Sequence, residues 1–198
     1  MPNSDAAKKL SGKKKGFFPD LPDWLARLLY WPTFTWNYLL GRVLQIRHWW
    51  DKVDSGLWLG AVPLRGDAKR FKEMGITGVI NMCDEYAGPI REYQQESIEQ
   101  LHLPTVDFHP PTLEMIERGV NFIQHHIAKG GSVYVHCKAG RARSATIALC
   151  YLVADKHMTA EEAQHYLLEK RPHINPLIYQ RKVVKDFVAD LEKKSSVK

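Results

Sequence analysis

S-V-Y-V-H-C-K-A-G-R-A-R-S-A-T-I-A-L-C-Y-L-V-A-D, residues 132–155, is the stretch that decides the fold of this chain. Residues 133–136 are apolar and partly β-branched, which predicts a buried strand. Residues 144–154 are apolar almost all round, which predicts a helix buried in the core. Between them lies a short loop, Cys137–Arg143, with Gly140 inside it. The chain therefore runs strand, tight loop, helix, with a cysteine opening the loop and an arginine closing it.

This loop has the composition of a phosphate-binding site. The N–H groups at the start of a helix lack intrahelical partners and carry about half a positive charge, so a loop there attracts anions. Gly140 lets the backbone turn inward, and the planar fork of Arg143 can hold two phosphate oxygens. The same field should lower the pKa of Cys137 into the range of roughly 3.5–7.5, which makes its thiolate a nucleophile for phosphorus. A structural cysteine in a basic turn is the alternative, which the flanking strand and helix disfavour.

The loop sequence H-C-K-A-G-R-A-R-S resembles the signature of the cysteine-dependent phosphatases of the dual-specificity, tyrosine-phosphatase-like superfamily. Within it, the chain is similar to the mitochondrial phosphatidylglycerophosphate phosphatases over about residues 24–190. This second similarity rests on four further stretches: Y-W-P-T (Tyr30–Thr33), W-L-G-A-V-P-L-R (Trp58–Arg65), G-V-I-N-M-C-D-E-Y (Gly78–Tyr86) and T-V-D (Thr105–Asp107). The resemblance implies a protein-tyrosine-phosphatase-like fold of the dual-specificity type. It also implies hydrolysis of phosphatidylglycerophosphate to phosphatidylglycerol, on the way to cardiolipin, at the mitochondrial inner membrane.

The hydrophobic pattern of residues 50–192 independently predicts a mixed α/β catalytic domain. Strands alternate with helices, which indicates a central, largely parallel sheet flanked by helices. The phosphate loop would then lie at the carboxyl end of a strand, where such folds bind ligands. The predicted strands are Gly56–Val62, Ile76–Cys83, Ile98–Leu103 and Val133–His136. The predicted helices are Asp67–Met74, one from Thr112 to Gly130, and Ser144–Ala154. A Thr159/Glu162 capping box opens a further helix, and the last helix has Val184, Phe187, Val188 and Leu191 on its buried face.

Residues 1–49 differ from the rest and are predicted to be a basic, aromatic-rich segment, while residues 193–198 form a polar tail. Ten aromatic residues fall between positions 17 and 50. The uncharged run Leu28–Gly41 has only 14 residues and contains Pro32, so it is too short for a conventional membrane span. Three interpretations stay open: an organelle-targeting sequence, an interfacial membrane anchor with Trp and Tyr at headgroup level, or a helical arm packed on the catalytic domain.

The net charge indicates the class of binding partner, and the cysteine content indicates whether disulfides are present. The net charge is +6, and the first 50 residues hold eight Lys or Arg against three Asp. No nucleic-acid motif accompanies this excess, so an anionic phospholipid and a membrane surface are the expected partners, and we expect a monomer. Three cysteines give no disulfide framework. Cys83, at a strand end, is expected to be a buried thiol, with a resolving partner for Cys137 as the alternative.

Displacing an alkoxide from phosphorus requires a proton donor for the leaving oxygen. Asp107 is the candidate, on a loop 30 residues before Cys137, and the T-V-D similarity points to it as well. Asp84 and His109 are the reserves. Ser144 can donate a hydrogen bond to the cysteine sulfur as it leaves, or can serve simply as a helix N-cap.

The remaining site residues are assigned to substrate binding. They are the loop residues Lys138, Ala139, Gly140, Arg141 and Ala142, with Glu85 and Tyr86 from the Asp84–Pro89 loop. Lys138 and Arg141 add positive charge beside the phosphate, a pattern that resembles lipid-directed members of the superfamily. A solvated loop charge is the alternative. No metal or other cofactor is expected, and the adjacent His125 and His126 are expected to be exposed.

These observations predict a metal-independent phosphomonoesterase that forms a cysteinyl-phosphate intermediate. Phosphatidylglycerophosphate is the expected substrate. A phosphoinositide phosphatase and a dual-specificity protein tyrosine and serine/threonine phosphatase are the alternatives among enzymes. A phosphate-reading module without turnover is disfavoured, because it would not need Cys137 and Asp107 beside Arg143.

Overall fold

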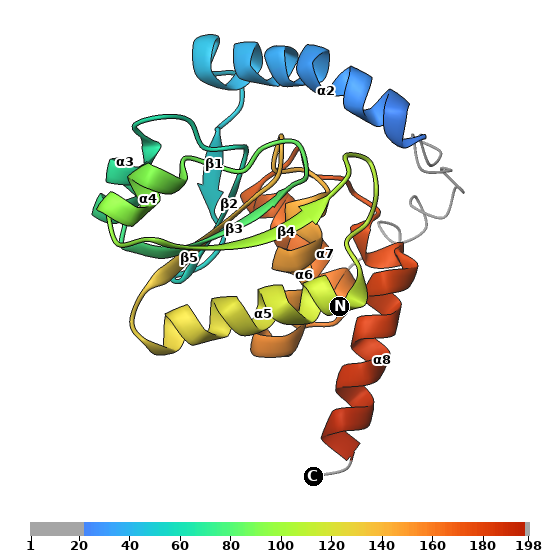
Figure 1. The fold of residues 1–198 in the computed structure, drawn as a ribbon. Helices are drawn as coiled ribbons and strands as arrows, with labels where there is room; N and C mark the ends of the chain where they lie inside the picture. The colour runs from blue at the N-terminus through green and yellow to red at the C-terminus, as the bar shows by residue number, and fades with distance from the viewer. Residues whose placement is uncertain (1–21, 197–198) are drawn as a thin grey trace.

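A computed structural model describes residues 22–196 of the chain and places a five-stranded sheet at its centre (Figure 1). The strand order is β1-β2-β5-β3-β4, and only β1 runs antiparallel to its neighbour. The predicted, largely parallel sheet is therefore confirmed. The strands are β1 (Trp50–Lys52), β2 (Leu57–Gly60), β3 (Ile76–Cys83), β4 (Glu99–Thr105) and β5 (Ser132–His136).

Helices cover both faces of the sheet. Two short helices, α3 (Asp67–Glu73) and α4 (Ile90–Gln95), lie on one face, where Phe71 and Tyr93 pack in one cluster with Tyr134 of β5. The larger core lies on the other face, and most of its buried residues are aliphatic. It is covered by α5 (Leu113–Ala128), α6 (Arg143–Lys156), α7 (Ala160–Lys170), the 3₁₀ turn η2 (Ile178–Gln180) and α8 (Lys182–Ser196).

The deciding stretch folds as its pattern predicts. Strand β5 lies between β2 and β3, and the first ten residues of α6, Arg143–Leu152, are all buried. The Thr112 cap of α5 and the Thr159/Glu162 capping box of α7 are also present. Helix α6 begins one residue earlier than predicted, with Ala142 at the N-cap position, so the alternative of Ser144 as an N-cap is wrong. Strand β1 and helix α4 were not predicted; both are short, and local patterns of three to six residues carry little signal.

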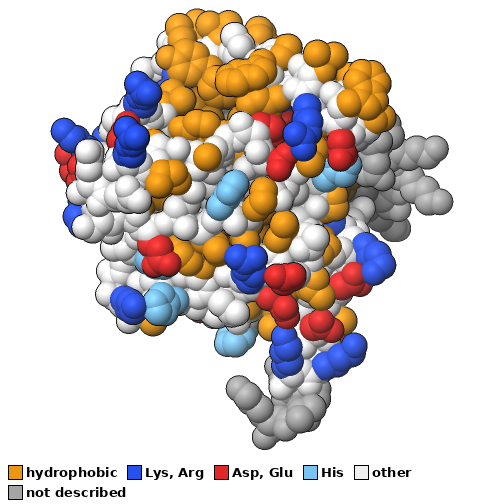
Figure 2. All heavy atoms as spheres, in the orientation of Figure 1, with side chains coloured by type: hydrophobic (Ala, Val, Ile, Leu, Met, Phe, Trp, Pro, Cys, Tyr) orange, Lys and Arg blue, Asp and Glu red, His pale blue; other side chains and the backbone are white. Residues whose placement is uncertain are grey.

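The described part of the N-terminal segment is a helix, α2 (Asp23–Tyr38), which continues into a π-helical turn, η1 (Leu39–Val43). Ala26 and Tyr30 are buried against the catalytic domain, whereas Trp24, Trp31 and Trp36 are more than 60% exposed. Apolar side chains accordingly gather along this edge of the molecule (Figure 2). Within residues 22–196, no helix has the length and apolar character needed to cross a bilayer. The expectations for residues 1–21 lie outside the described residues.

Candidate active site

The Cys137–Arg143 loop follows β5 at the carboxyl edge of the parallel strands, as predicted. Its turn depends on Gly140, whose φ of +65° lies in the left-handed region that favours glycine. A Cβ at this position would come within 2.4 Å of the Gly60 carbonyl group at the end of β2. A side chain would therefore push the loop away from the neighbouring strand.

The thiol of Cys137 lies at the base of this loop and is 4% exposed. The hydroxyl of Ser144 donates a hydrogen bond to its sulfur at 3.2 Å. Burial by itself raises the pKa of the thiol. The nearby Arg143 guanidinium, with hydrogen bonds from Ser144 and the backbone N–H of Arg141, outweighs burial and lowers the pKa to about 7. A substantial fraction of Cys137 is therefore thiolate at neutral pH.

The Arg143 guanidinium is 1% exposed and contacts the ends of β3 and β4. Nη1 donates to the carbonyl of Thr105 at 2.5 Å and to the Glu85 carboxylate at 3.2 Å, and Nη2 donates to Asp107 at 2.9 Å. Nε is buried without a hydrogen-bond partner among the described residues. An unpaired buried donor is costly, and a phosphate oxygen would satisfy it.

Asp107 follows β4 and is brought directly to the loop, as predicted from the sequence. Its carboxylate pairs with both Arg143 and Lys138, and its backbone N–H donates to Glu85 at 3.1 Å. The two reserve residues point elsewhere. Asp84 pairs with Arg27 of α2 at 2.8 Å, and the His109 Nε2 lies 3.6 Å from Asp23. Of the three acid candidates, Asp107 is thus the one that lies beside Arg143, where Glu85 also lies.

Lys138 is 5% exposed and is not a solvated loop charge. Besides Asp107, its amine donates to the Thr33 hydroxyl at 2.6 Å and lies 5.1 Å from the ring centre of Tyr30. Both partners belong to α2. This contact was not predicted, because Thr33 and Lys138 lie 105 positions apart in the sequence. Arg141 points the other way: its side chain is exposed and donates to the carbonyl of His173 at 2.7 Å.

A second buried arginine, Arg171, holds the loop from behind. Its guanidinium donates to the carbonyls of Gly140 at 2.9 Å and Ala139 at 3.1 Å, and it pairs with Asp51 at 2.5 Å. Because these carbonyls point toward Arg171, they are turned away from the anion-binding side of the loop. A single arginine at the end of a helix carries no sequence signal for such a role, so this role of Arg171 was not predicted.

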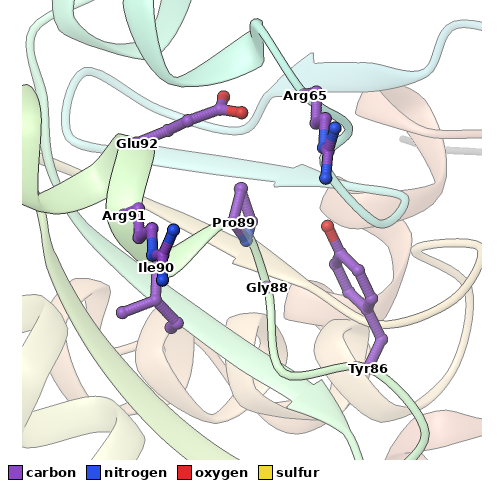
Figure 3. Close-up of a pocket in the computed structure, with 7 residues that line it drawn as sticks. All are labelled: Arg65, Tyr86, Gly88, Pro89, Ile90, Arg91 and Glu92. Carbon is purple, nitrogen blue, oxygen red and sulfur yellow. The ribbon is translucent and has the colours of Figure 1, made fainter.

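Glu85 and Tyr86 separate in the structure. Glu85 lies in the site, where it accepts from Arg143 and from the Asp107 backbone. The Tyr86 hydroxyl instead donates to the Pro63 carbonyl at 3.1 Å. Its ring lines a neighbouring cavity of about 560 Å³, with its hydroxyl end directed toward Arg65 (Figure 3). This cavity is distinct from the phosphate-binding loop, because its lining does not include Cys137, Arg143 or Asp107.

Cys83, His136 and His126 are all buried. Cys83 is buried, and burial raises the pKa of its thiol, as expected of a core cysteine. His136 is buried beneath the loop, and burial lowers its pKa to about 3, so its ring is neutral. The expectation that His126 is exposed is wrong. It is 6% exposed and lies 2.8 Å from the Thr77 hydroxyl, because α5 turns it toward the sheet.

Taken together, the site offers a nucleophilic thiolate, a guanidinium whose buried Nε–H has no hydrogen-bond partner among the described residues, and a carboxyl group paired with that guanidinium. The family described as dual specificity phosphatase, catalytic domain, matches residues 57–189, which include all of these groups.

This chain belongs to the dual-specificity phosphatase family. It is therefore a phosphatase, as its site chemistry predicts.

Among its relatives, the phosphatidylglycerophosphate phosphatase PTPMT2 of Arabidopsis thaliana is 39% identical over 164 residues, which cover 81% of this chain and 72% of that protein. The mouse (Mus musculus) protein named phosphatidylglycerophosphatase and protein-tyrosine phosphatase 1 is 38% identical over 172 residues, covering 82% and 89%. The crystal structure of PTPMT1 in complex with PI(5)P superposes with a TM-score of 0.69 at 34% identity, covering 75% of this chain and 99% of that one. The family resemblance inferred from the sequence is confirmed.

Removing the Ser144 hydroxyl should raise the pKa of Cys137. Ser144→Ala deletes a hydrogen bond to the thiolate, so the thiolate loses stabilisation and the pKa should rise from about 7 by about one unit. The rate of iodoacetamide alkylation should increase with pH through this pKa, and the variant's profile should move to higher pH. Thr146→Ala is the matched control, because its hydroxyl bonds the Ala142 carbonyl instead. Coincident profiles for wild type and Ser144→Ala would contradict this account.

Arg171→Met should weaken phosphate binding although Arg171 lies behind the loop. Losing the donors to Ala139 and Gly140 lets their carbonyls turn, and a misplacement of this kind can cost about 10²-fold in rate. We expect a corresponding loss in kcat/KM on a soluble aryl phosphate, and weaker competitive inhibition by vanadate. Lys170→Met, on the exposed side of the same helix, should change neither. Unchanged vanadate inhibition in a folded Arg171→Met protein would refute the positioning role.

Proposed function

We propose that this phosphatase hydrolyses phosphatidylglycerophosphate to phosphatidylglycerol and orthophosphate, through a cysteinyl-phosphate on Cys137. The observation that carries the reaction is the convergence of Cys137, Arg143 and Asp107 at one strand edge. The choice of substrate is supported by relatives of this name that align with more than four fifths of the chain.

In the first step, the Arg143 fork and the loop N–H groups hold the phosphate oxygens while the Cys137 thiolate attacks phosphorus. The sulfur–phosphorus bond forms as the bond to the glycerol oxygen breaks. Asp107 gives its proton to that oxygen, so the alcohol leaves neutral. The Asp107 carboxylate accepts a hydrogen bond from Arg143 Nη2 at 2.9 Å. We therefore expect the incoming phosphate to replace the carboxylate on Arg143, and the released carboxylate to take up a proton from solvent before it acts as the acid.

In the second step, Asp107 accepts a proton from water as the water attacks the cysteinyl-phosphate. Orthophosphate is released and the sulfur leaves as a thiolate. The Ser144 hydroxyl, 3.2 Å from that sulfur, stabilises the charge that returns to it. No step requires a metal ion. A protein that only binds phosphate, without turnover, would need neither the thiolate nor the acid of this scheme.

The proposed setting is the inner mitochondrial membrane, with an anionic phospholipid as substrate, a membrane surface as partner and no nucleic acid. Support comes from the basic, aromatic N-terminal segment and from the role that the relatives' names describe. We propose that the chain acts as a monomer.

A phosphoinositide is the second candidate substrate. The observation in its favour is the 34% identical PTPMT1 structure, which is described as a complex with PI(5)P. Both candidates present a phosphomonoester on a lipid headgroup, so the loop chemistry alone suits either. A phosphoprotein substrate is the third candidate, which the name of the mouse relative includes.

Comparing substrates directly tests the proposal. We expect phosphate release in EDTA to be fastest with phosphatidylglycerophosphate in mixed micelles, slower with phosphoinositides in the same micelles, and slowest with a phosphotyrosine peptide. Cys137→Ser is the blank, because a hydroxyl is a much weaker nucleophile than a thiolate. A higher kcat/KM for the peptide would overturn the lipid proposal and leave a protein phosphatase.

Replacing Asp107 tests the acid. Asp107→Asn keeps the size of the side chain but carries no acidic proton, so turnover should fall by roughly 10²–10⁴ on an alkyl phosphate. The loss should be much smaller on an aryl phosphate with a good leaving group, which departs without protonation. Asp84→Asn is the matched control and should stay close to wild type. Equal losses on both kinds of ester would argue for a structural role instead.

A further inference from the structure

Helix α2 and the residues after it present an apolar outer surface. Of the ten large hydrophobic side chains that the described residues expose, nine lie in this segment. We call them the α2 surface: Trp24, Leu28, Trp31, Trp36, Tyr38, Leu39, Val43, Leu44 and Ile46, each between 38% and 68% exposed. Figure 2 shows apolar side chains concentrated over this helix. Isolated exposed hydrophobic residues are ordinary, but a contiguous group of this size marks an interaction site.

The charged side chains of this helix are exposed, but each contacts a residue of the catalytic domain. Asp23 and Arg27 are the charged residues of α2, and each faces a residue of the catalytic domain, His109 and Asp84 respectively. Arg42 of η1 pairs with Asp67 in the same way. The α2 surface therefore offers apolar and aromatic area, and the exposed charged side chains beside it, Asp23 and Arg27, already have partners in the catalytic domain. That composition fits a lipid interface better than a specific protein partner.

The inner side of α2 is fixed to the catalytic edge of the sheet. Lys138, which donates to Thr33, follows β5; Asp84, which pairs with Arg27, follows β3; and His109 follows β4. All three contacts thus fall where the parallel strands end, on the edge that carries Cys137. Figure 1 shows α2 lying across this edge of the molecule. Whatever binds the outer side of α2 is held next to the active site.

We infer that the α2 surface docks on an anionic lipid bilayer and that docking turns the catalytic edge toward the lipid. The inference deepens the proposed function, on which it rests for its lipid substrate. The helix is 16 residues long, about 24 Å, so it is suited to lying in the plane of the interface. Three tryptophans and a tyrosine supply the side chains that favour headgroup level.

Charge complementarity selects an anionic bilayer. The sequence leading into α2 carries five lysines, Lys8, Lys9, Lys13, Lys14 and Lys15, within eight residues, and Asp20 is the sole acidic residue between positions 6 and 22. Clusters of basic residues beside an interfacial segment bind anionic headgroups. The product that we propose, phosphatidylglycerol, is itself such a lipid. A docked enzyme would therefore stay on the surface that supplies its substrate.

Binding is measured by cosedimentation of the full 198-residue chain with vesicles of phosphatidylcholine alone or mixed with phosphatidylglycerol. Neither vesicle contains a phosphomonoester, so binding is read independently of turnover. We expect binding to the mixed vesicles, and weaker binding to the neutral ones. The triple variant Trp24→Ser, Trp31→Ser, Trp36→Ser should lose binding about tenfold or more, and Trp31→Ser alone should lose part of it. Ile90→Ser, an exposed apolar residue outside the α2 surface, should bind like wild type.

Activity separates this inference from the proposed function. Hydrolysis of a soluble aryl phosphate should be equal in wild type and the triple variant, which shows that the variant is folded. Hydrolysis of phosphatidylglycerophosphate in vesicles should fall together with binding. If the wild-type chain binds mixed vesicles but does not hydrolyse this lipid, the proposed substrate is wrong and the docking inference is retained.

Three results would overturn the docking inference. The first is a folded triple variant that binds mixed vesicles as tightly as wild type. The second is equal binding of wild type to neutral and anionic vesicles, which would remove the anionic bilayer as the partner. The third is concentration-dependent dimerisation that the triple variant lacks, without vesicle binding, which would assign the surface to a second copy of the chain.

Discussion

The buried guanidinium of Arg143 is the group on which the geometry of the site depends. A charge that is 1% exposed is tolerated only when it is paired and hydrogen-bonded. Its partners come from the ends of two strands and from the loop that follows each: Met82 in β3 with Glu85 after it, and Thr105 in β4 with Asp107 after it. The need to satisfy one cation therefore gathers segments that lie up to 61 residues away in the sequence. The active-site edge forms because Arg143 cannot be buried without it.

Which features of the fold and the site can be predicted from the sequence depends on how far apart in the sequence the interacting residues lie. The strand, the loop and the buried helix around Cys137 are local, and periodicity with one glycine predicts them to within a residue or two. The position of Asp107 was predicted from chemical need and family similarity. The direction of the Lys138 side chain was not predicted, because it depends on Thr33 and Tyr30, more than 100 residues earlier. Arg171 was missed for the same reason: its partners Gly140 and Asp51 adjoin it only after folding.

The described part of the N-terminal segment is a helix with one packed face and one exposed face. Ala26, Tyr30 and Phe34 recur at helical spacing and pack inward, as an arm on the catalytic domain would. Trp24, Leu28 and Trp31 recur at the same spacing on the other side and stay exposed. Composition alone cannot separate the two faces, because both are aromatic and apolar. The placement of the few charges decides it, since each ion pair of α2 points toward the catalytic domain.

Charge balance explains why a carboxyl group belongs so close to the phosphate cradle. The site places two cations, Arg143 and Lys138, beside the carboxylates of Glu85 and Asp107 and the thiolate of Cys137. A phosphate dianion brings further negative charge into this buried space, where Coulomb interactions are strong. A proton carried on Asp107 offsets part of that charge, and it is the proton that the leaving alkoxide needs. In the proposed mechanism, phosphate thus replaces the Asp107 carboxylate on Arg143, and protonation of the released carboxyl group both lowers the negative charge of the site and prepares the acid.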